Sequence, residues 1–365
     1  MKDWKHLVPL CGMLMWLHCR PADDPPLQAP GGGPQTRVRL IADRLNGRDI
    51  LVVGESRLAF YTAFLAPGPT DAGFRAVQDS LPVVLADAAG NAYDIWGRVV
   101  AGPARGGRLE PANAMMAYWF AWGASYPGCA LHQFPAVNAP PEPPGESGWL
   151  IPYSRLSRGA FPGAIPSIDA PVYLERETDF MPYLTDETLC LAVLLGDKVF
   201  VFPHPVLEWH EVVNDEQAGV PFAVLYCPLT GSGCTWRRDS FSFEVSGLLY
   251  NSNLIAWERT SDSYWSQLRH EAVGGSLAGQ KAVSLQTLEM PLGTVRRLFR
   301  YFQLLSDQTP YDWEYGNFPC GNYCTDHDLI LYNLFFDDPR LPRKERTFGV
   351  IVDGQAKVYR QTAFE

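Results

Sequence analysis

The chain has 365 residues, of which 47% are hydrophobic and 13% aromatic, so it can bury a large core and is too long for one ordinary domain. Its formal net charge is -10, and no basic run exceeds a few residues. This argues against a nucleic-acid partner, because phosphate contacts need clustered Lys and Arg. We therefore expect two domains or one duplicated fold.

The N-terminus has the pattern of an export signal. Two lysines precede a short apolar run, residues 7–17, which ends near Cys19 and is too short for a membrane-spanning helix. This predicts a signal peptide over residues 1–19. Cys19 indicates the lipoprotein type, although the residues just before it are larger than such signals usually carry. Residues 20–36 are rich in Pro and Gly and predict a flexible tether. The expected location is the periplasm or cell envelope, with membrane contact only through the anchor.

Most of the remaining chain predicts β-strands. Short apolar runs rich in Val, Leu, Phe and Tyr are bounded by Gly, Asp and Asn. Two pairs of such runs turn back at Gly196-Asp197 and at Asp353-Gly354, which predicts hairpins. Helices are expected only at 111–127, which begins with Pro and is rich in aromatics, and at 292–305, which has an apolar stripe.

Two internal similarities predict a duplication. Residues 91–109 and 262–282 each follow an acidic residue, contain a Tyr and end in G-x-x-x-G, and the hairpin at 191–202 is echoed at 348–359. The fold class is therefore α+β and β-rich, an internally duplicated sheet domain with few helices. We expect a first copy over 37–134, a Pro-rich connection over 135–184, a second copy with the main site over 185–305, and a C-terminal segment over 306–365 that closes the sheet. Chance similarity between β-rich segments is the alternative.

A thiol, an imidazole and a carboxylate lie close together in the second copy. His210, Asn214 and Asp215 precede a strand that ends at Cys227. A cysteine acts as a nucleophile or metal ligand only as thiolate, which a neighbouring imidazole or metal promotes. His210 would act as the base for Cys227, and Asn214 or Asp215 would orient the imidazole. The alternative is a free buried cysteine and an unrelated surface histidine.

The stretch 243–267 is dense in amide, hydroxyl and aromatic side chains. On adjacent strands such groups line a polar pocket with apolar walls. The predicted lining residues are Tyr250, Asn251, Ser252, Arg259, Trp265 and Gln267. The alternative is a strand with a polar outer face and an ordinary turn.

The cysteines leave several interpretations open. Six lie beyond the predicted signal, and the sequence alone does not choose their pairing. Cys320, Cys324 and His327 indicate zinc only weakly, because structural zinc sites usually have C-x-x-C pairs and a second pair elsewhere. In an exported protein a disulfide is the competing interpretation.

The strings HEVVND, YCPLTGSG and FEVSGLLYNSNLIAWER resemble the bacterial domain-of-unknown-function family 3179, whose members are usually exported or lipid-anchored. The resemblance is strongest over 189–279 and implies no established activity. The matching positions are His210, Asn214, Asp215, Cys227, Pro228, Gly231, Gly247, Tyr250, Asn251, Ser252, Arg259, Trp265 and Gln267. Relatives often carry a second cysteine where this chain has Thr230, which weakens a two-thiol mechanism. Relatives also differ at Cys320 and Cys324, so the resemblance implies that these two form a local disulfide.

Three functions remain open. The leading one is a cell-envelope binding protein that takes a small polar molecule, or a soft metal ion such as copper, at a pocket edged by Cys227 and His210. The second is a thiol-dependent enzyme with Cys227 as nucleophile and His210 as base. The third is a structural envelope protein, in which tight turns explain these residues.

Overall fold

The computed structural model describes residues 36–68, 73–175, 179–239 and 241–365. Strands account for 40% of the chain and helices for 9%, so the prediction of a β-rich protein with few helices is confirmed. Within the described ranges, no helix is long and apolar enough to cross a membrane. The predicted signal peptide, its Cys19 and nearly all of the predicted tether lie outside the described residues.

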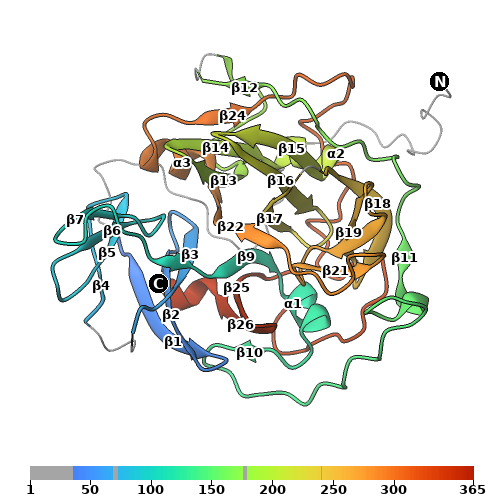
Figure 1. Ribbon diagram of the computed structural model, residues 1–365, viewed down its shortest axis with the longest axis horizontal. Coiled ribbons are helices and arrows are strands. Elements are labelled where there is room, and N and C mark those ends of the chain that lie inside the picture. Colours follow the sequence, from blue (N-terminus) through green and yellow to red (C-terminus); the bar gives the residue numbers. More distant parts are fainter. Residues whose placement is uncertain (1–35, 69–72, 176–178, 240) are drawn as a thin grey trace.

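The N-terminal strands form a first unit, which Figure 1 colours from blue to teal. In chain order its elements are β1 (Arg39–Leu45), β2 (Arg48–Glu55), β3 (Phe60–Leu65), β4 (Arg75–Ala76), β5 (Val83–Ala86), β6 (Ala92–Asp94), β7 (Val99–Ala101), β8 (Glu110–Pro111), β9 (Asn113–Tyr118), α1 (Trp119–Ser125) and β10 (Ala130–Leu131). The meander β1-β2-β3 takes β8 as its fourth strand, and β4 to β7 form a separate antiparallel sheet. Strand β9 continues directly into α1.

A second unit repeats this plan. In chain order its elements are β13 (Leu189–Leu195), β14 (Lys198–Pro203), α2 (His204–His210), β15 (Val212–Gln217), β16 (Val220–Cys227), β17 (Ser232–Arg237), β18 (Phe243–Tyr250), β19 (Asn253–Glu258), β20 (Ser263–Ser266), β21 (Glu271–Gly274), β22 (Val283–Leu285), β23 (Thr287–Pro291), α3 (Leu292–Leu298) and β24 (Gln303–Leu305). The meander β15-β16-β17 takes β22, as β1-β2-β3 takes β8, and β23 continues into α3. Between the units lie η2 (Tyr153–Arg155), β11 (Ser157–Arg158) and β12 (Tyr173–Leu174); β11 and β12 pair with β18 and β24.

The C-terminal hairpin belongs to the first unit. It consists of β25 (Arg346–Val352), β26 (Gln355–Arg360) and the short η4 (Gln361–Phe364). Strand β25 pairs antiparallel with β9 and β26 pairs parallel with β10, just as β13 pairs with β23 and β14 with β24. In Figure 1 the hairpin lies in red beside β9. The hairpin that begins the second unit is thus supplied to the first unit by the end of the chain. Both predicted hairpin turns are confirmed.

The similarity between the two G-x-x-x-G segments extends to their backbone geometry. Gly102 and Gly275 both have positive φ, and a Cβ on either would come 2.6 Å from the Cα of Asn91 or of Ser263. Each of these two side chains accepts a backbone N–H from the residue two positions past its glycine, at 2.8 and 3.0 Å. Only glycine tolerates this approach. The repeated contact agrees with a duplication, while the predicted copy boundaries remain predictions.

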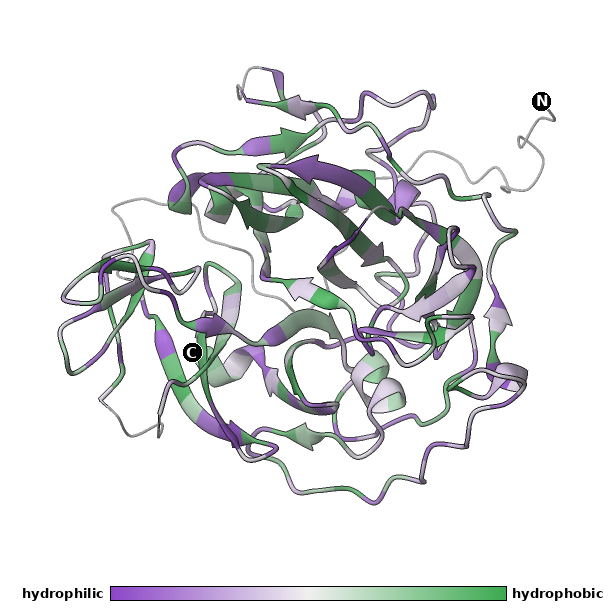
Figure 2. Cartoon of the chain, in the orientation of Figure 1, coloured by the Kyte–Doolittle hydropathy of each residue, from purple (hydrophilic) through white to green (hydrophobic). Residues whose placement is uncertain are grey.

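The units meet through their central strands. Strand β9 lies against β17, and β23 lies against β3. Because β9 is the equivalent of β23, and β3 of β17, the same contact occurs twice, which indicates approximate twofold symmetry. One buried cluster joins apolar residues of both units, among them Val53, Phe64, Leu191 and Phe202. Figure 2 shows the hydrophobic runs of the central strands that supply this core.

Both predicted helices are shorter than expected. In the first, 111–127, the leading half is β9 and only α1 is helical, because pairing with β25 overrides local helix propensity. In the second, 292–305, α3 ends at Leu298 and the chain resumes as β24 beside β14. Each strand is fixed by a partner distant in sequence.

Candidate functional site

A long irregular segment covers the sequence motifs of the second unit. Residues 306–345, which we call the roof segment, contain no helix or strand. The Tyr315 hydroxyl lies 2.7 Å from Nε2 of His210, at the end of α2. The Tyr323 hydroxyl donates to the carbonyl of Leu229, in the turn after β16, at 2.8 Å. Connections this long are uncommon in compact domains and usually serve a function.

The structure does not join Cys227 to His210. The Nδ1 atom of His210 donates to the carbonyl of Pro166 at 2.8 Å, and its other ring nitrogen bonds to the roof segment. The Cys227 thiol donates to the carbonyl of Ser252 at 3.8 Å. Burial lowers the pKa of His210, whereas burial and the charge of Glu211 raise the pKa of Cys227 to about 11. A thiol with a raised pKa is not an activated nucleophile.

Asn214 and Asp215 do not orient the imidazole, so that predicted role is wrong for both. The Asn214 amide donates to the carbonyl of Phe243 and accepts from its N–H, both at 2.9 Å. Asp215 accepts from the Tyr173 hydroxyl at 2.8 Å. These bonds tie β15 to β18 and to β12, because the side chains point across the sheets and away from the end of α2.

Three of the six predicted pocket residues lie apart from any common site. Arg259 is exposed and pairs with Glu244. Trp265 is packed in an apolar cluster. The Tyr250 hydroxyl donates to Glu142 at 2.8 Å, in the connection between the units.

Two others, Asn251 and Ser252, hold the roof segment in place. Asn251 accepts a hydrogen bond from the N–H of Phe335 at 2.8 Å, and Ser252 donates to the carbonyl of Tyr332 at 3.0 Å. Both residues have positive φ, in the two-residue turn between β18 and β19. Their amide and hydroxyl groups are therefore engaged by the chain itself.

The sixth, Gln267, belongs to a buried network beneath the turn after β16. Its amide nitrogen donates to the carbonyls of Leu225 and Ser232, each at 3.0 Å. Its oxygen accepts from Ser232 Oγ at 2.8 Å and from Asn253 at 2.7 Å, and Asn253 also donates to Thr230 at 2.9 Å. This network fixes the YCPLTGSG turn. The six predicted residues do not line one pocket.

Two acidic side chains at the end of α2 form the strongest candidate site. Glu208 and Glu211 are each 9% exposed. Neither accepts a hydrogen bond or pairs with a cation among the residues that the structure describes. Burial raises the pKa of each carboxyl to about 8. Strongly perturbed acids in a shielded site are typical of functional groups.

The roof segment carries a buried amine, Lys344, and a thiol, Cys320, on which the charges of both acids act. Lys344 is fully buried, and its ammonium donates to the carbonyls of Tyr323 and Asp326 and lies 3.3 Å from the Tyr323 ring centroid. Burial lowers the pKa of Lys344 to about 8. Burial and the charges of Glu211 and Cys227 raise the pKa of the Cys320 thiol to about 12. Acids, thiols and an amine therefore share one shielded region.

A buried ion pair joins the two units near Tyr118, on which Glu208 also acts. Arg346 of β25 donates to Glu289 of β23, and both side chains are 6% exposed. Nε2 of His204 lies 3.6 Å from the other oxygen of Glu289, and neither atom has a hydrogen bond. Burial holds the pKa of His204 well below its usual value, so the imidazole is neutral.

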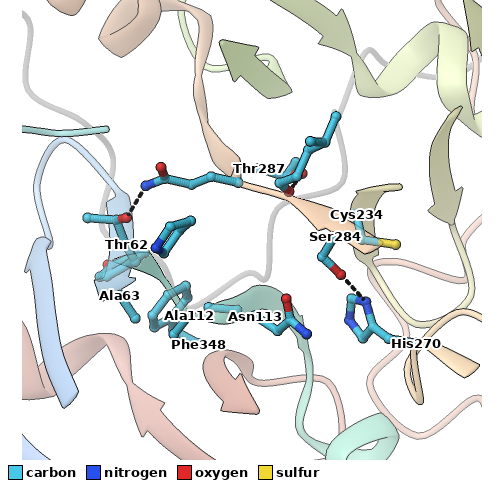
Figure 3. Close-up of a pocket in the computed structure, with 14 residues that line it drawn as sticks. Thr62, Ala63, Ala112, Asn113, Cys234, His270, Ser284, Thr287 and Phe348 are labelled. Carbon is cyan, nitrogen blue, oxygen red and sulfur yellow. Dashed lines mark hydrogen bonds between the residues drawn. The ribbon is translucent and has the colours of Figure 1, made fainter. Parts of the chain in front are cut away.

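A small cleft lies where the two units meet, at β3, β9 and β22 (Figure 3). Its volume is about 20 Å³, room for about one water molecule. Nδ1 of His270 accepts from Trp236 at 3.0 Å and lies 2.9 Å from Ser284 Oγ. Burial lowers the pKa of His270 to about 4, so it is too weak a base to activate Ser284.

The state of the cysteines bears on the predicted disulfide and on the predicted metal sites. Among the described residues five cysteines are free: Cys129, Cys190, Cys227, Cys234 and Cys320. The predicted disulfide between Cys320 and Cys324 is therefore wrong, because Cys320 packs as a thiol against the apolar cluster under the roof segment. The described residues contain no group of three or more His, Cys, Asp or Glu side chains able to hold a metal ion. The copper and zinc interpretations gain no support.

Sequence reasoning missed Glu208, Glu211 and Lys344. A signal was present in the spacing of His204 and Glu208, which places two titratable groups on one face of a helix. That signal becomes readable only once α2 is known to be a helix. Lys344 carries no local signal, since only tertiary packing buries it.

Comparisons with known proteins give a family but no activity. No curated protein and no solved structure matches the chain. The family described as "Protein of unknown function (DUF3179)" matches residues 162–365, more than half of the chain. The match includes α2, the turn after β16, the roof segment and the C-terminal hairpin. The chain therefore belongs to the DUF3179 family, as its sequence resemblance predicted.

Proposed function

We propose that this chain is an exported binding protein for a small polar molecule, and that the ligand lies beneath the roof segment against the last turn of α2. One observation carries the proposal: Glu208 and Glu211 are buried without partners among the described residues. Burying a polar group without a hydrogen bond costs about 1 to 3 kcal/mol, and a charge costs more. Such groups persist where a ligand supplies the missing partner.

The backbone at this turn supports the same proposal. Glu211 caps α2 in the left-handed conformation, with φ +57°. A side chain there costs roughly 1 kcal/mol or more relative to glycine. Strained residues of this kind gather at binding and catalytic sites.

The thiol-enzyme alternative has weaker support. Burial keeps Cys227 protonated at neutral pH, and its contacts do not include His210. A copper site is likewise weakly supported, because Cys227 and His210 contact different groups. Location in the cell envelope rests on the signal pattern at residues 1–19.

The test measures how fast the cysteines beneath the roof segment react with a thiol reagent. The full chain is treated with a thiol reagent in the presence of pooled metabolite-sized compounds, and the labelling rate of each cysteine is read by peptide mass spectrometry. A ligand at the proposed site slows labelling of Cys227 and Cys320 about tenfold when present at ten times its Kd. Cys190 in β13, 0% exposed, is the matched control and should keep its rate. If no compound separates Cys227 from Cys190, the proposed function is wrong.

A further inference from the structure

Three titratable side chains lie on the last turns of α2 and at its C-cap. His204 and Glu208 are four residues apart on one side of the helix, and Glu211 follows as the left-handed C-cap. Their exposed fractions are 4%, 9% and 9%. The charges of both carboxyl groups act on the Cys320 thiol, so the two acids lie around one buried region in which a single ligand could contact both.

The cations nearest to this pair are engaged elsewhere. Arg346 is bound to Glu289, and Lys344 donates to two backbone carbonyls of the roof segment. Glu208 acts electrostatically on the hydroxyls of Tyr118 and Tyr226. Once ionised, the two acids would therefore give the site a negative potential that the described residues do not neutralise.

We propose that the ligand of this site is a small organic cation, a primary ammonium or a guanidinium, held between the carboxylates of Glu208 and Glu211. The inference rests on the proposed function and adds the chemical class of the ligand. An ammonium or guanidinium group supplies several N–H donors, which form charge-assisted bonds to carboxylates. A metal ion fits less well, because the described residues provide no third ligating side chain.

The binding is coupled to proton release. At neutral pH the empty site holds its acids largely protonated, because burial raises both pKa values to about 8. A bound cation stabilises the carboxylate form, so each Glu releases its proton to solvent as it pairs. Below about pH 8 the affinity should rise about tenfold per pH unit for each proton released.

The experiment is calorimetric titration of the full chain with agmatine, which carries one ammonium and one guanidinium group. 1,4-Butanediol serves as the uncharged probe of similar length. Titrations in two buffers of different ionisation enthalpy give the number of protons released. We expect agmatine to bind at least about tenfold more tightly near pH 8 than near pH 6, with net proton release between them. Glu208→Gln and Glu211→Gln should each weaken binding at least tenfold and reduce the release. Glu216→Gln, an exposed acid on β15, should change neither.

Several outcomes would overturn the inference: equal binding of the diol and agmatine, no proton release, or unchanged agmatine binding in both glutamine variants. Absence of agmatine binding counts against it too. The thiol-labelling experiment separates this failure from failure of the proposed function. If neutral or anionic compounds protect Cys227 while agmatine does not, the binding site stands and the cation is wrong. If nothing protects Cys227, both proposals fall.

Discussion

The two units follow one strand plan, yet they differ at the turn after their second strand. Glu55 pairs with the first residue of β3, and Cys227 pairs with the first residue of β17, so the two occupy equivalent positions. The Glu55 carboxylate is fully engaged, accepting from the Leu58 N–H at 2.5 Å and from Arg57 at 3.3 Å. In the second unit a thiol stands there, beside the unpartnered Glu211.

The same contrast holds at the helix that follows the hairpin. Matched hairpins align η4 with α2, so Glu365 is the equivalent of Glu208, and matched meanders make Arg39 the equivalent of Glu211. Glu365 and Arg39 are exposed, whereas their counterparts are buried. The shared plan therefore does not require buried acids. The second unit carries them against the tendency of carboxyl groups to remain in water, which points to a function.

The largest expected effect comes from breaking the first unit. Deleting residues 346–365 removes the strand partners of β9 and β10. We expect the truncated chain to lose cooperative unfolding altogether, because β9, which lies against the second unit, and β10 would be left with unpaired backbone groups. Thermal unfolding followed by circular dichroism, together with soluble yield, checks this.

A circular permutant is the matched control. In the second unit, the residue equivalent to Glu365 directly precedes the residue equivalent to Arg37. Glu365 should therefore join directly to Arg37, with new chain ends between Asn138 and Ala139 in the Pro-rich loop. Gly54 pairs with Arg39 and lies in contact with Phe364, which brings the two ends together. We expect the permutant to fold. Failure of the permutant alongside normal folding of the truncated chain would disprove the equivalence of the hairpins.

The next largest effect is expected from the buried ion pair between Arg346 and Glu289, which has no equivalent at the matching positions of the repeat. The equivalents of Glu289 and Arg346 are Met116 and Leu189, which form no ion pair. Arg346→Leu leaves the Glu289 charge buried without its partner and should lower the free energy of unfolding by about 3 to 5 kcal/mol. The double change Arg346→Leu with Glu289→Met copies the first unit and should recover most of that loss. Urea denaturation measures both, and a double variant no better than the single would show that the pair is needed for stability itself.

The acid pair predicts a pH-dependent difference. Burial raises the pKa of Glu208 from 4.5 to about 8, so between these values the folded state keeps a proton that the unfolded state releases. Stability therefore falls as pH rises from about 4.5 to about 8 and then levels. Glu208→Gln removes this loss and should raise the free energy of unfolding by about 1 to 3 kcal/mol at pH 9, with little change at pH 4.5. Glu216→Gln is the control. Equal effects at both pH values would mean that the carboxyl is not buried as described.

Sequence reasoning reached the strands and failed at the site, for physical reasons. The hairpin turns at Gly196-Asp197 and Asp353-Gly354 are determined by the local sequence, namely the turn residues and the apolar runs on either side. Half of the first predicted helix is β9, because its partner β25 lies far along the chain. Cys227 and His210 are near in sequence, but the two ring nitrogens of His210 bond to Pro166 and to Tyr315 of the roof segment instead of the thiol. Burial of Glu208 is a tertiary property that no local pattern contains.

The smallest expected effect tests how firmly the roof segment is held on the second unit. Tyr315→Phe removes the hydrogen bond to Nε2 of His210 and leaves a buried acceptor unpaired. The free energy of unfolding should fall by about 1 kcal/mol. If the roof segment opens locally, labelling of Cys227 and Cys320 should accelerate by more than that of Cys190, because core thiols need global unfolding. Equal acceleration of all three would show that the roof segment unfolds only with the whole protein, and the ligand would then need another route to the acids.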